Sequence, residues 1–333
     1  MANMLVSTQE EIQQVEMERP HVVILGAGAS FAAFESGDRN GKKLPLMNNL
    51  VETLGLKELL DSTGLSFASS NFEDIYSFIY SAPGLTEVRS ELERRVHRYF
   101  ASMELPDHPT IYDHLVLSLR PKDVIATFNW DPFLVQAIER NMHRFQPPLS
   151  LYLHGNVKIG ECSSRHHMGI VGKQCQKCKG EIEPSRLLFP IGEKNYNADP
   201  FLSKQWRALE SSLESAFMIT LFGYGAPTSD ASAIALFKKS WGSIDQRNME
   251  EIEIIDVREE DDLVETWSPF IHSHHYRIES DFYDSFIANH PRRTGEAYLN
   301  QFLKAKFIEG NRLPKSAGFS ELWEWYENIR RFE

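Results

Sequence analysis

The sequence predicts an α/β protein built on a doubly wound parallel sheet. Short apolar runs that end in glycine or polar residues recur along the chain, at 21–30, 123–131, 149–155, 216–225 and 252–257. Segments with apolar residues at helical spacing separate these runs. Buried strands that alternate with helices are typical of a parallel sheet covered by helices on both faces.

Length and composition set the broad class. A chain of 333 residues is long enough for one large domain or two modest ones. Hydrophobic residues make up 42% and charged residues 25%, which is ordinary for a globular protein. The formal net charge of −12 argues against a general affinity for nucleic acid or for anionic membranes.

The sequence shows neither a membrane-spanning segment nor a secretory signal. No apolar run approaches the roughly 20 residues needed to span a bilayer. Residues 1–20 form a polar, acidic lead-in without the basic and apolar regions of a secretory signal. We therefore expect a cytoplasmic protein that has no membrane partner.

The first half of the chain opens with HVVILGAGAS (21–30), a buried strand that runs into a glycine turn. Helices are then expected over 47–60, 71–80, 85–101 and 112–119. Glu73 and Asp74 lie in the first turn of the helix over 71–80, where acidic side chains are favoured by the helix dipole. We interpret them as structural residues.

The segment Asp123–Val157 contains a strand, a helix and a second strand, each strand ending in polar residues. Asn129 and Asp131 follow the first strand, and His154 follows the second. Ligands of open parallel sheets bind outside the carboxyl ends of the strands. We therefore expect these three side chains around one crevice. Asn and Asp also cap helices, and a single His is often only a hydrogen-bond partner, so we expect a structural role for one of the three.

The second half continues the alternation. A helix over 206–213 precedes the strand at 216–225, a helix over 231–241 precedes the strand at 252–257, and HSHHYRIES is typical of an edge strand. After His275 the sequence is mainly helical. We expect the sheet domain to span 21–285 and a helical C-terminal extension to span 286–333.

The motif GAGASF (Gly26–Phe31) follows a strand and opens a helix. Gly26 and Gly28 allow a tight turn and a close backbone approach, so that amide groups can face a pyrophosphate. Phe31 replaces the third glycine of the common dinucleotide fingerprint, and no clear acidic residue ends a second strand to hold a ribose. The motif favours phosphate binding over a plain turn, and it does not establish a hydride-transferring dehydrogenase.

All three cysteines lie in the segment 161–183. Cys162, His166, Cys175 and Cys178 form C-x3-H followed by C-x2-C, with His167 as the alternative to His166. Thiolates and imidazoles at such spacing suit tetrahedral zinc. Four protein ligands leave no open position, so we expect a structural zinc insert in a reducing compartment, and three unligated thiols are the alternative.

The order GAGAS, TFNWD, LHGN, a cysteine cluster, LFGYG and EIIDV resembles the silent-information-regulator (sirtuin-like) family over roughly residues 20–285. CQKCKGEIEPSRLLFPIGE is similar to the second half of a sirtuin zinc ribbon and the segment after it. The chain departs from sirtuin deacylases at GAGASFAAFESGD, which leads to LPLMNNL instead of a GIPDFR-like segment. Phe128 also replaces the glutamine of their TQNID-like motif. These departures and NFEDIYSFIY are closer to the bacterial sirtuin-like NAD hydrolases of antiphage defence.

The resemblance implies a Rossmann-like, sirtuin-like fold that binds NAD as its substrate. It assigns a ribose hydroxyl or the attacking water to Asn129, the general base to His154, and site orientation or charge stabilisation to Asp131. The residues that it implies for the cofactor are Gly26, Ala27, Gly28, Ala29, Ser30 and Gly223.

The activity implied is NAD glycohydrolysis, which gives ADP-ribose and nicotinamide. An NAD-dependent protein deacylase is the alternative that the zinc ribbon favours, and a non-catalytic scaffold that binds NAD or ADP-ribose is a third. Because constitutive destruction of NAD is toxic, we expect a homo-oligomer that is restrained until an activating partner, such as a HerA-like ATPase, engages it.

Overall fold

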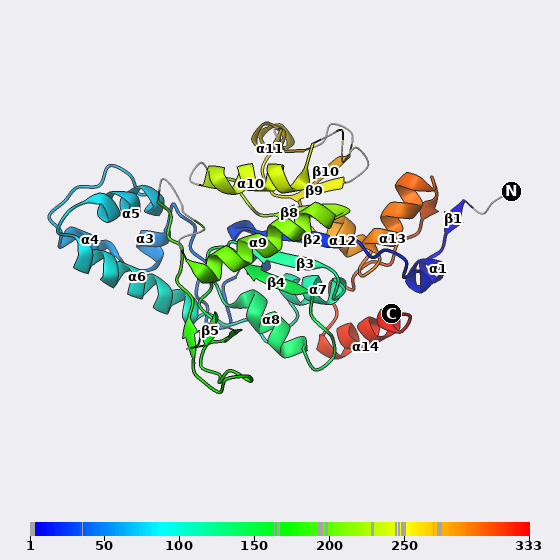
Figure 1. The fold of residues 1–333 in the computed structure, drawn as a ribbon, viewed down its shortest axis with the longest axis horizontal. Helices are drawn as coiled ribbons and strands as arrows, with labels where there is room; N and C mark the ends of the chain where they lie inside the picture. The colour runs from blue at the N-terminus through cyan, green and yellow to red at the C-terminus, as the bar shows by residue number, and fades with distance from the viewer. Residues whose placement is uncertain are drawn as a thin grey trace.

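A six-stranded parallel sheet forms the centre of the computed structural model (Figure 1). The structure describes residues 4–34, 36–162, 164, 167–191, 196, 199–227, 230–243, 245, 247, 251–268, 270–271 and 275–333. The strands are β2 (His21–Leu25), β3 (Val124–Thr127), β4 (Leu149–Tyr152), β8 (Met218–Phe222), β9 (Glu251–Ile255) and β10 (Tyr276–Glu279).

The strand order is β10-β9-β8-β2-β3-β4, and every neighbouring pair is parallel. The chain runs outward from β2 to β4, returns to the centre at β8, and then runs outward to β10. The order therefore reverses between β2 and β8. The doubly wound parallel sheet predicted from the sequence is confirmed, and β10 is the expected edge strand.

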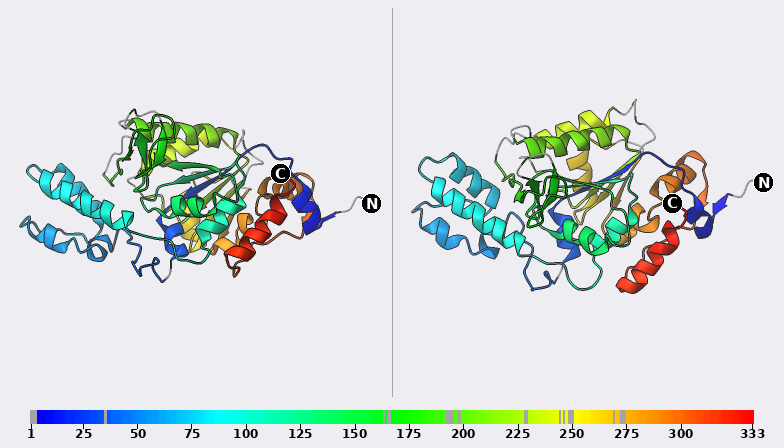
Figure 2. Two further views of the ribbon diagram at one scale, coloured as in Figure 1. Left: turned by 90° about the horizontal axis from the view of Figure 1, so that it is seen from below. Right: turned by 60° about the horizontal axis from the view of Figure 1, so that its bottom comes forward.

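Helices cover both faces of the sheet (Figure 2). The helices α9 (Pro200–Ser215) and α10 (Ala231–Trp241) pack together on one face, whereas α2 (Ala27–Ala33), α7 (Ile111–Ser118) and α8 (Phe133–Asn141) lie on the other. This double cover explains why the strands are continuously apolar rather than alternating. Val22, Val23, Ile24 and Leu25 of β2 are all fully buried.

A helical lobe extends from one end of the molecule (Figure 1). Its elements are α3 (Leu50–Thr53), α4 (Lys57–Asp61), α5 (Phe72–Ser81) and α6 (Thr86–Ala101). The single helix expected over 47–60 is wrong. The chain makes two short helices there because Gly55 adopts a φ of +62°, which a continuing right-handed helix cannot contain.

The small insert is an antiparallel sheet of β5 (Ile159–Cys162), β6 (Met168–Ile170) and β7 (Ile182–Pro184). The helix α11 (Glu260–Trp267) connects β9 to β10. No helix within the described ranges is long and apolar enough to cross a bilayer.

The C-terminal extension is mainly helical, as predicted, and lies opposite the lobe (Figure 1). Near the N-terminus, β1 (Leu5–Val6) pairs in parallel with β11 (Phe307–Ile308). A buried ion pair between Arg120 and Glu296, 2.9 Å apart, joins this region to the end of α7. The helices of the extension are α12 (Phe286–Asn289), α13 (Thr294–Tyr298), the π-helix η3 (Leu299–Leu303) and α14 (Phe319–Arg330). The short helix η2 (Phe282–Asp284) precedes the extension, and α1 (Thr8–Gln13) follows β1.

A buried polar chain crosses three strands of the sheet. Glu253 of β9 accepts hydrogen bonds from the Thr220 hydroxyl (2.9 Å) and from the backbone amide of Phe286 (2.6 Å). The ring of His21 on β2 contacts the same Thr220 hydroxyl at 2.8 Å. Burial raises the pKa of Glu253 to about 7 and lowers the pKa of His21 to about 3. A carboxyl group is thus kept partly protonated inside the sheet near neutral pH.

Replacing Glu253 by Gln should change how stability depends on pH. The folded-state pKa lies above the ordinary value of 4.5, so this group's contribution is complete below about pH 4.5 and is lost as pH rises through about 7. The Glu253→Gln variant should therefore lose less stability than the parent between about pH 5 and 8, by up to about 3 kcal/mol. Urea unfolding at both pH values measures this, with the exposed Glu265→Gln as control. Equal losses in parent and Glu253→Gln would contradict the prediction.

Candidate active site

Two adjoining cavities lie at the carboxyl ends of the central strands. The first is about 270 Å³ and is lined by Asn129, Asp131 and His154, together with Gly26, Ala27 and Gly223. The second is about 710 Å³ and extends past Gly28 to Asp256, at the end of β9. Both are lined by Ala27, Gly223 and Gly225, so they adjoin each other, and we refer to the two together as the cleft. The cleft lies where the strand order reverses, which is the usual ligand position in such sheets.

The glycines of the first turn permit a close contact between two backbones. A Cβ on Gly26 would lie 2.4 Å from the Gly223 oxygen, and one on Gly28 would lie 2.7 Å from the Gly223 Cα. Gly223 itself has a φ of +60°. The amides of Gly26 and Gly28 donate to the carbonyls of Phe222 and Gly223, each at 2.9 Å. These two amides are therefore engaged within the protein, and these glycines shape the cleft by packing.

Asn129 is held in one orientation by its amide group. Its Nδ2 donates to the Gly26 carbonyl at 2.8 Å and to the Ser30 hydroxyl at 3.0 Å, and it lies 3.4 Å from the Tyr112 hydroxyl. Since a carbonyl oxygen can only accept, these contacts fix which end of the amide is the nitrogen. The Oδ1 atom of Asn129 is therefore the end left to accept a hydrogen bond from a bound group.

Asp131 is part of the same network. The Ser30 hydroxyl donates to Asp131 Oδ2 at 2.7 Å, and the Phe133 amide donates to Oδ1 at 3.2 Å. Since the single Ser30 proton is used here, the Tyr112 hydroxyl, 2.5 Å from Ser30 Oγ, must be the donor of that pair. Burial raises the pKa of Asp131 to about 6. The carboxylate is therefore mostly ionised at neutral pH although it is buried.

His154 follows β4 and is also buried. Its ring meets the edge of Phe128, with centroids 4.7 Å apart, and Phe128 stacks on Tyr224 at 4.2 Å. Its Nε2 lies 3.7 Å from Asp230 Oδ1, while the other oxygen of Asp230 accepts from the Tyr224 hydroxyl at 2.9 Å. A carboxylate at this position helps to orient the imidazole ring.

The structure places the other predicted residues beside these. Ser30 and Ala29 are buried at the start of α2, where the Ser30 hydroxyl belongs to the Asn129–Asp131 network and Ala29 packs in the core. Glu73, interpreted from the sequence as an acidic first-turn residue, also lines the first cavity. Its amide is capped by Asn71 at 2.8 Å.

Four residues of the site were not predicted from the sequence: Tyr112, Asn156, Tyr224 and Asp230. Asn156 had a signal, because it ends the LHGN motif, and its Nδ2 donates to the Asp131 carbonyl at 2.6 Å. Asp230 immediately precedes α10, a position that is typical of a helix cap. Tyr112 had no local signal, because it enters the site from a helix before β3.

A second cluster lies in the insert. One ligand atom each from Cys162, His167 and Cys175 lie within 4.8 Å of one another, and both cysteines are buried. Two sulfurs and an imidazole nitrogen at this separation fit a zinc ion. Cys178 is exposed and lies outside this group. His166 lies outside the described residues. The structure thus brings together three of the five candidate ligands and includes His167, the alternative histidine.

Comparison with known proteins gives structural neighbours only. No family model and no curated protein sequence matches the chain. A Sir2 homologue in complex with NAD is similar at 14% identity and a TM-score of 0.41, covering 89% of this chain and 91% of its own. A Sir2 homologue mutant with ADP-ribose is similar at 15% identity and a TM-score of 0.40, with coverage of 89% and 95%. A Sir2 structure with bound acetylated peptide shows 14% identity, a TM-score of 0.32, and coverage of 72% and 82%. Likeness at this level assigns no activity to this chain.

The choice between the two histidines of the insert can be tested. His167→Ala should reduce bound zinc well below one equivalent, because an imidazole ligand is lost, whereas His166→Ala should retain it. Metal analysis of the purified protein, combined with thiol titration, measures both. Full zinc in His167→Ala with loss in His166→Ala would contradict the assignment. Substoichiometric zinc and freely titratable thiols in the parent protein would argue against a zinc site altogether.

Proposed function

We propose that the protein is an NAD glycohydrolase that releases nicotinamide and ADP-ribose. The observation that carries the proposal is the convergence of Asn129, Asp131 and His154 at one cavity that adjoins a second, larger one. A dinucleotide is an elongated ligand with two ends of different chemistry. The cleft offers it a polar reaction end and, beyond the glycines, a larger end that reaches Asp256.

The reaction breaks the bond between the nicotinamide nitrogen and C1′ of the ribose. The nicotinamide leaves with the bonding electron pair and becomes neutral, so no general acid is required. The ribose passes through an oxocarbenium-like state, as in glycoside cleavage. Water adds to C1′, and its proton passes to a base and then to solvent. NAD and water thus give ADP-ribose, nicotinamide and one proton.

The side chains of the site suit these steps. Asn129, whose amide nitrogen is engaged by Gly26 and Ser30, has Oδ1 to accept from a ribose hydroxyl or from the attacking water. His154 is the general base, and Asp230 at 3.7 Å stabilises the charge that the imidazole acquires. Asp131 lines the same cavity, and its carboxylate stabilises the positive charge that develops on the ribose.

The larger cavity accommodates the remainder of the ligand. Ala27, Gly28 and Gly223 line it next to the first turn, where the pyrophosphate would lie. Asp256, at the carboxyl end of β9, pairs with Arg258 through both of its oxygens, at 3.2 and 2.9 Å. The remaining lone pairs of these oxygens can accept from ribose hydroxyl groups. Zinc bound by Cys162, His167 and Cys175 would hold the strands of the insert together, and no reaction step passes through it.

The sequence resemblance extends the proposal to a biological setting. We propose that the hydrolase acts in bacterial antiphage defence as a homo-oligomer, with an activating partner such as a HerA-like ATPase. Uncontrolled hydrolysis of NAD harms the cell that makes the enzyme, so the activity requires restraint. A protein that is monomeric in size-exclusion chromatography and fully active alone would contradict this part of the proposal.

Nicotinamide release from NAD by the purified protein tests the activity. Release should not require an acetylated peptide, and Asn129→Ala and His154→Ala should each lower kcat/KM by about 100-fold or more. Asn40→Ala, which removes an exposed amide outside the cleft, is the control and should retain the parent rate. All variants should melt at similar temperatures.

Two outcomes distinguish the candidate activities, and a third tests the assignment of the site. Release that occurs only with an acetylated peptide would identify an NAD-dependent deacylase. Binding of NAD or ADP-ribose without release, in the presence and absence of a partner, would identify a scaffold. Release that persists in both site variants would contradict the assignment of the site.

The pH dependence tests Asp131. Its pKa is raised to about 6, so the carboxylate loses its charge as pH falls through about 6. The acid limb of log(kcat/KM) in the parent protein should therefore include a fall through about pH 6 that comes from this carboxylate. Asp131→Asn should be slower and should lack that fall, so that the slope of its acid limb is smaller. A slope that is unchanged by Asp131→Asn would contradict the role of an ionised carboxylate.

A further inference from the structure

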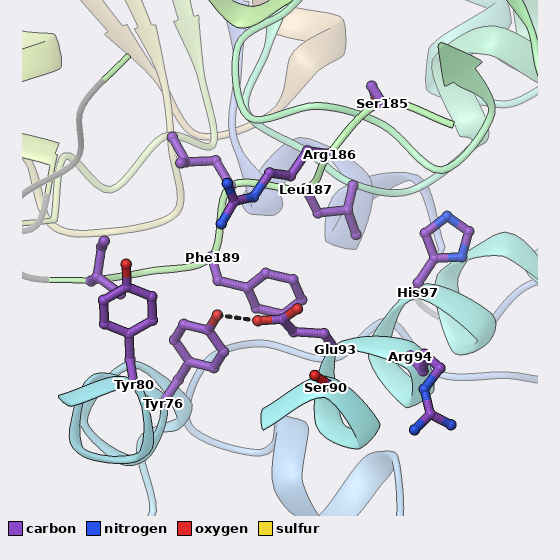
Figure 3. A pocket seen from close by; sticks show the side chains of 12 residues that line it. Tyr76, Tyr80, Ser90, Glu93, Arg94, His97, Ser185, Arg186, Leu187 and Phe189 are labelled. Atoms are coloured by element: carbon purple, nitrogen blue, oxygen red, sulfur yellow. Dashed lines mark hydrogen bonds between the residues drawn. The ribbon is translucent and has the colours of Figure 1, made fainter. Parts of the chain in front are cut away.

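A separate cavity lies between the helical lobe and the segment 185–191. It is about 440 Å³, within the size range of small-molecule sites. One wall comes from α5 and α6, and the other from the segment that follows the insert (Figure 3). It shares only Leu188 with the first active-site cavity and no residue with the second. It is therefore a distinct pocket beside the proposed active site.

The walls of this pocket are aromatic. Tyr76, Tyr80 and Phe189 line it, and the rings of Tyr76 and Phe189 stack with centroids 4.8 Å apart. In Figure 3 the exposed Arg186 points toward the space between Tyr80 and Phe189. The guanidinium over the Tyr80 ring is that of Arg89, 5.1 Å from the ring centroid. Planar rings and a guanidinium group form surfaces on which a further planar ring can stack.

The charges of the pocket favour an anion. Among its described lining residues the carboxylate is Glu93, which accepts from the Tyr76 hydroxyl at 2.6 Å and lies 3.7 Å from Arg89. Arg94 is paired with Glu91. Within the described parts of the chain, Arg186 makes no hydrogen bond or ion pair, and the buried Nε2 of His97 has no hydrogen-bond partner. Arg186 is thus a cationic group that no described carboxylate of this acidic chain pairs with.

The segment 185–191 links this pocket to the proposed active site. Phe189 contacts Tyr76 on one side and Trp130 on the other, at a centroid distance of 4.9 Å, and Trp130 lines the active-site cavity. The backbone amide of Leu188 donates to the carbonyl of His154 at 2.9 Å. A ligand that holds Phe189 and Leu188 therefore acts on the residues next to the base.

We propose that this pocket is an effector site for a ribonucleoside monophosphate, whose base packs against the exposed ring of Tyr80 and whose phosphate pairs with Arg186. Guanidinium and phosphate form paired, charge-assisted hydrogen bonds. Binding stabilises the arrangement of 185–191 that supports His154 and so raises turnover. This regulatory part rests on the proposed hydrolase activity, whereas the binding itself does not.

Calorimetry with AMP, GMP, UMP and CMP tests the site, and inorganic phosphate is the probe that lacks a ring. At least one nucleotide should bind with one-to-one stoichiometry in the presence of saturating ADP-ribose, which blocks the cleft. Arg186→Ala should weaken this binding at least about tenfold, and Arg186→Lys should weaken it less. Arg312→Ala, which removes another exposed arginine, should leave it unchanged.

Three results would overturn the proposal. They are nucleotide binding that ADP-ribose abolishes, equal nucleotide binding by Arg186→Ala and the parent, and no binding of any of the four nucleotides up to millimolar concentration. A second experiment measures the rate of nicotinamide release from NAD with and without the nucleotide. The bound nucleotide should raise this rate by about fivefold or more in the parent protein and should not raise it in Arg186→Ala. Binding with unchanged release would overturn the effector role. If no NAD is hydrolysed under any condition, the proposed function fails while the calorimetry still decides the site.

Discussion

The hydroxyl of Ser30 connects the first strand-end turn of the sheet to the second. It donates to Asp131 and accepts from Asn129 and Tyr112, within 2.5–3.0 Å in each case. Because it has only one proton, the direction of every hydrogen bond around it is determined. The orientation of Asn129 and the environment of the Asp131 carboxylate both follow from this one group. A buried network in which each member is satisfied specifies a single arrangement, whereas a partly satisfied one costs free energy.

The place of this network in the fold follows from the contact between the turns after β2 and β8. These strands are neighbours at which the strand order reverses, so the chain leaves them toward opposite sides and opens a cleft. Gly26, Gly28 and Gly223 let the two turns touch backbone to backbone, which side chains at these positions would prevent. At these three glycines the cleft is therefore bounded by backbone atoms, and the polar side chains lie beside them.

The parts of the site that depend on sheet geometry follow from the sequence alone. Parallel strands end at one edge, so the strand-end positions of Asn129, Asp131 and His154 are enough to bring the three together. Tyr112 and Asp230 do not follow in this way, because each enters from a helix whose rotation and position depend on packing. The break at Gly55 depends on a local backbone angle, and the presence of His167 in the cysteine cluster depends on how the insert folds. Hydrophobic periodicity records neither.

His154 is constrained through its backbone as well as through its ring. The next residue, Gly155, has a φ of +75°, and a Cβ there would lie 2.2 Å from the carbonyl oxygen of Arg186. With the hydrogen bond from Leu188 to His154, this contact makes 154–155 and 186–188 one packed unit. A shift of the segment that carries Arg186 cannot leave the histidine in place, because packed backbones do not slide past one another freely. Under the proposed role of His154, control from outside the cleft needs no large domain motion, because Phe189 packs between Tyr76 and Trp130 in the segment that contacts the His154 backbone.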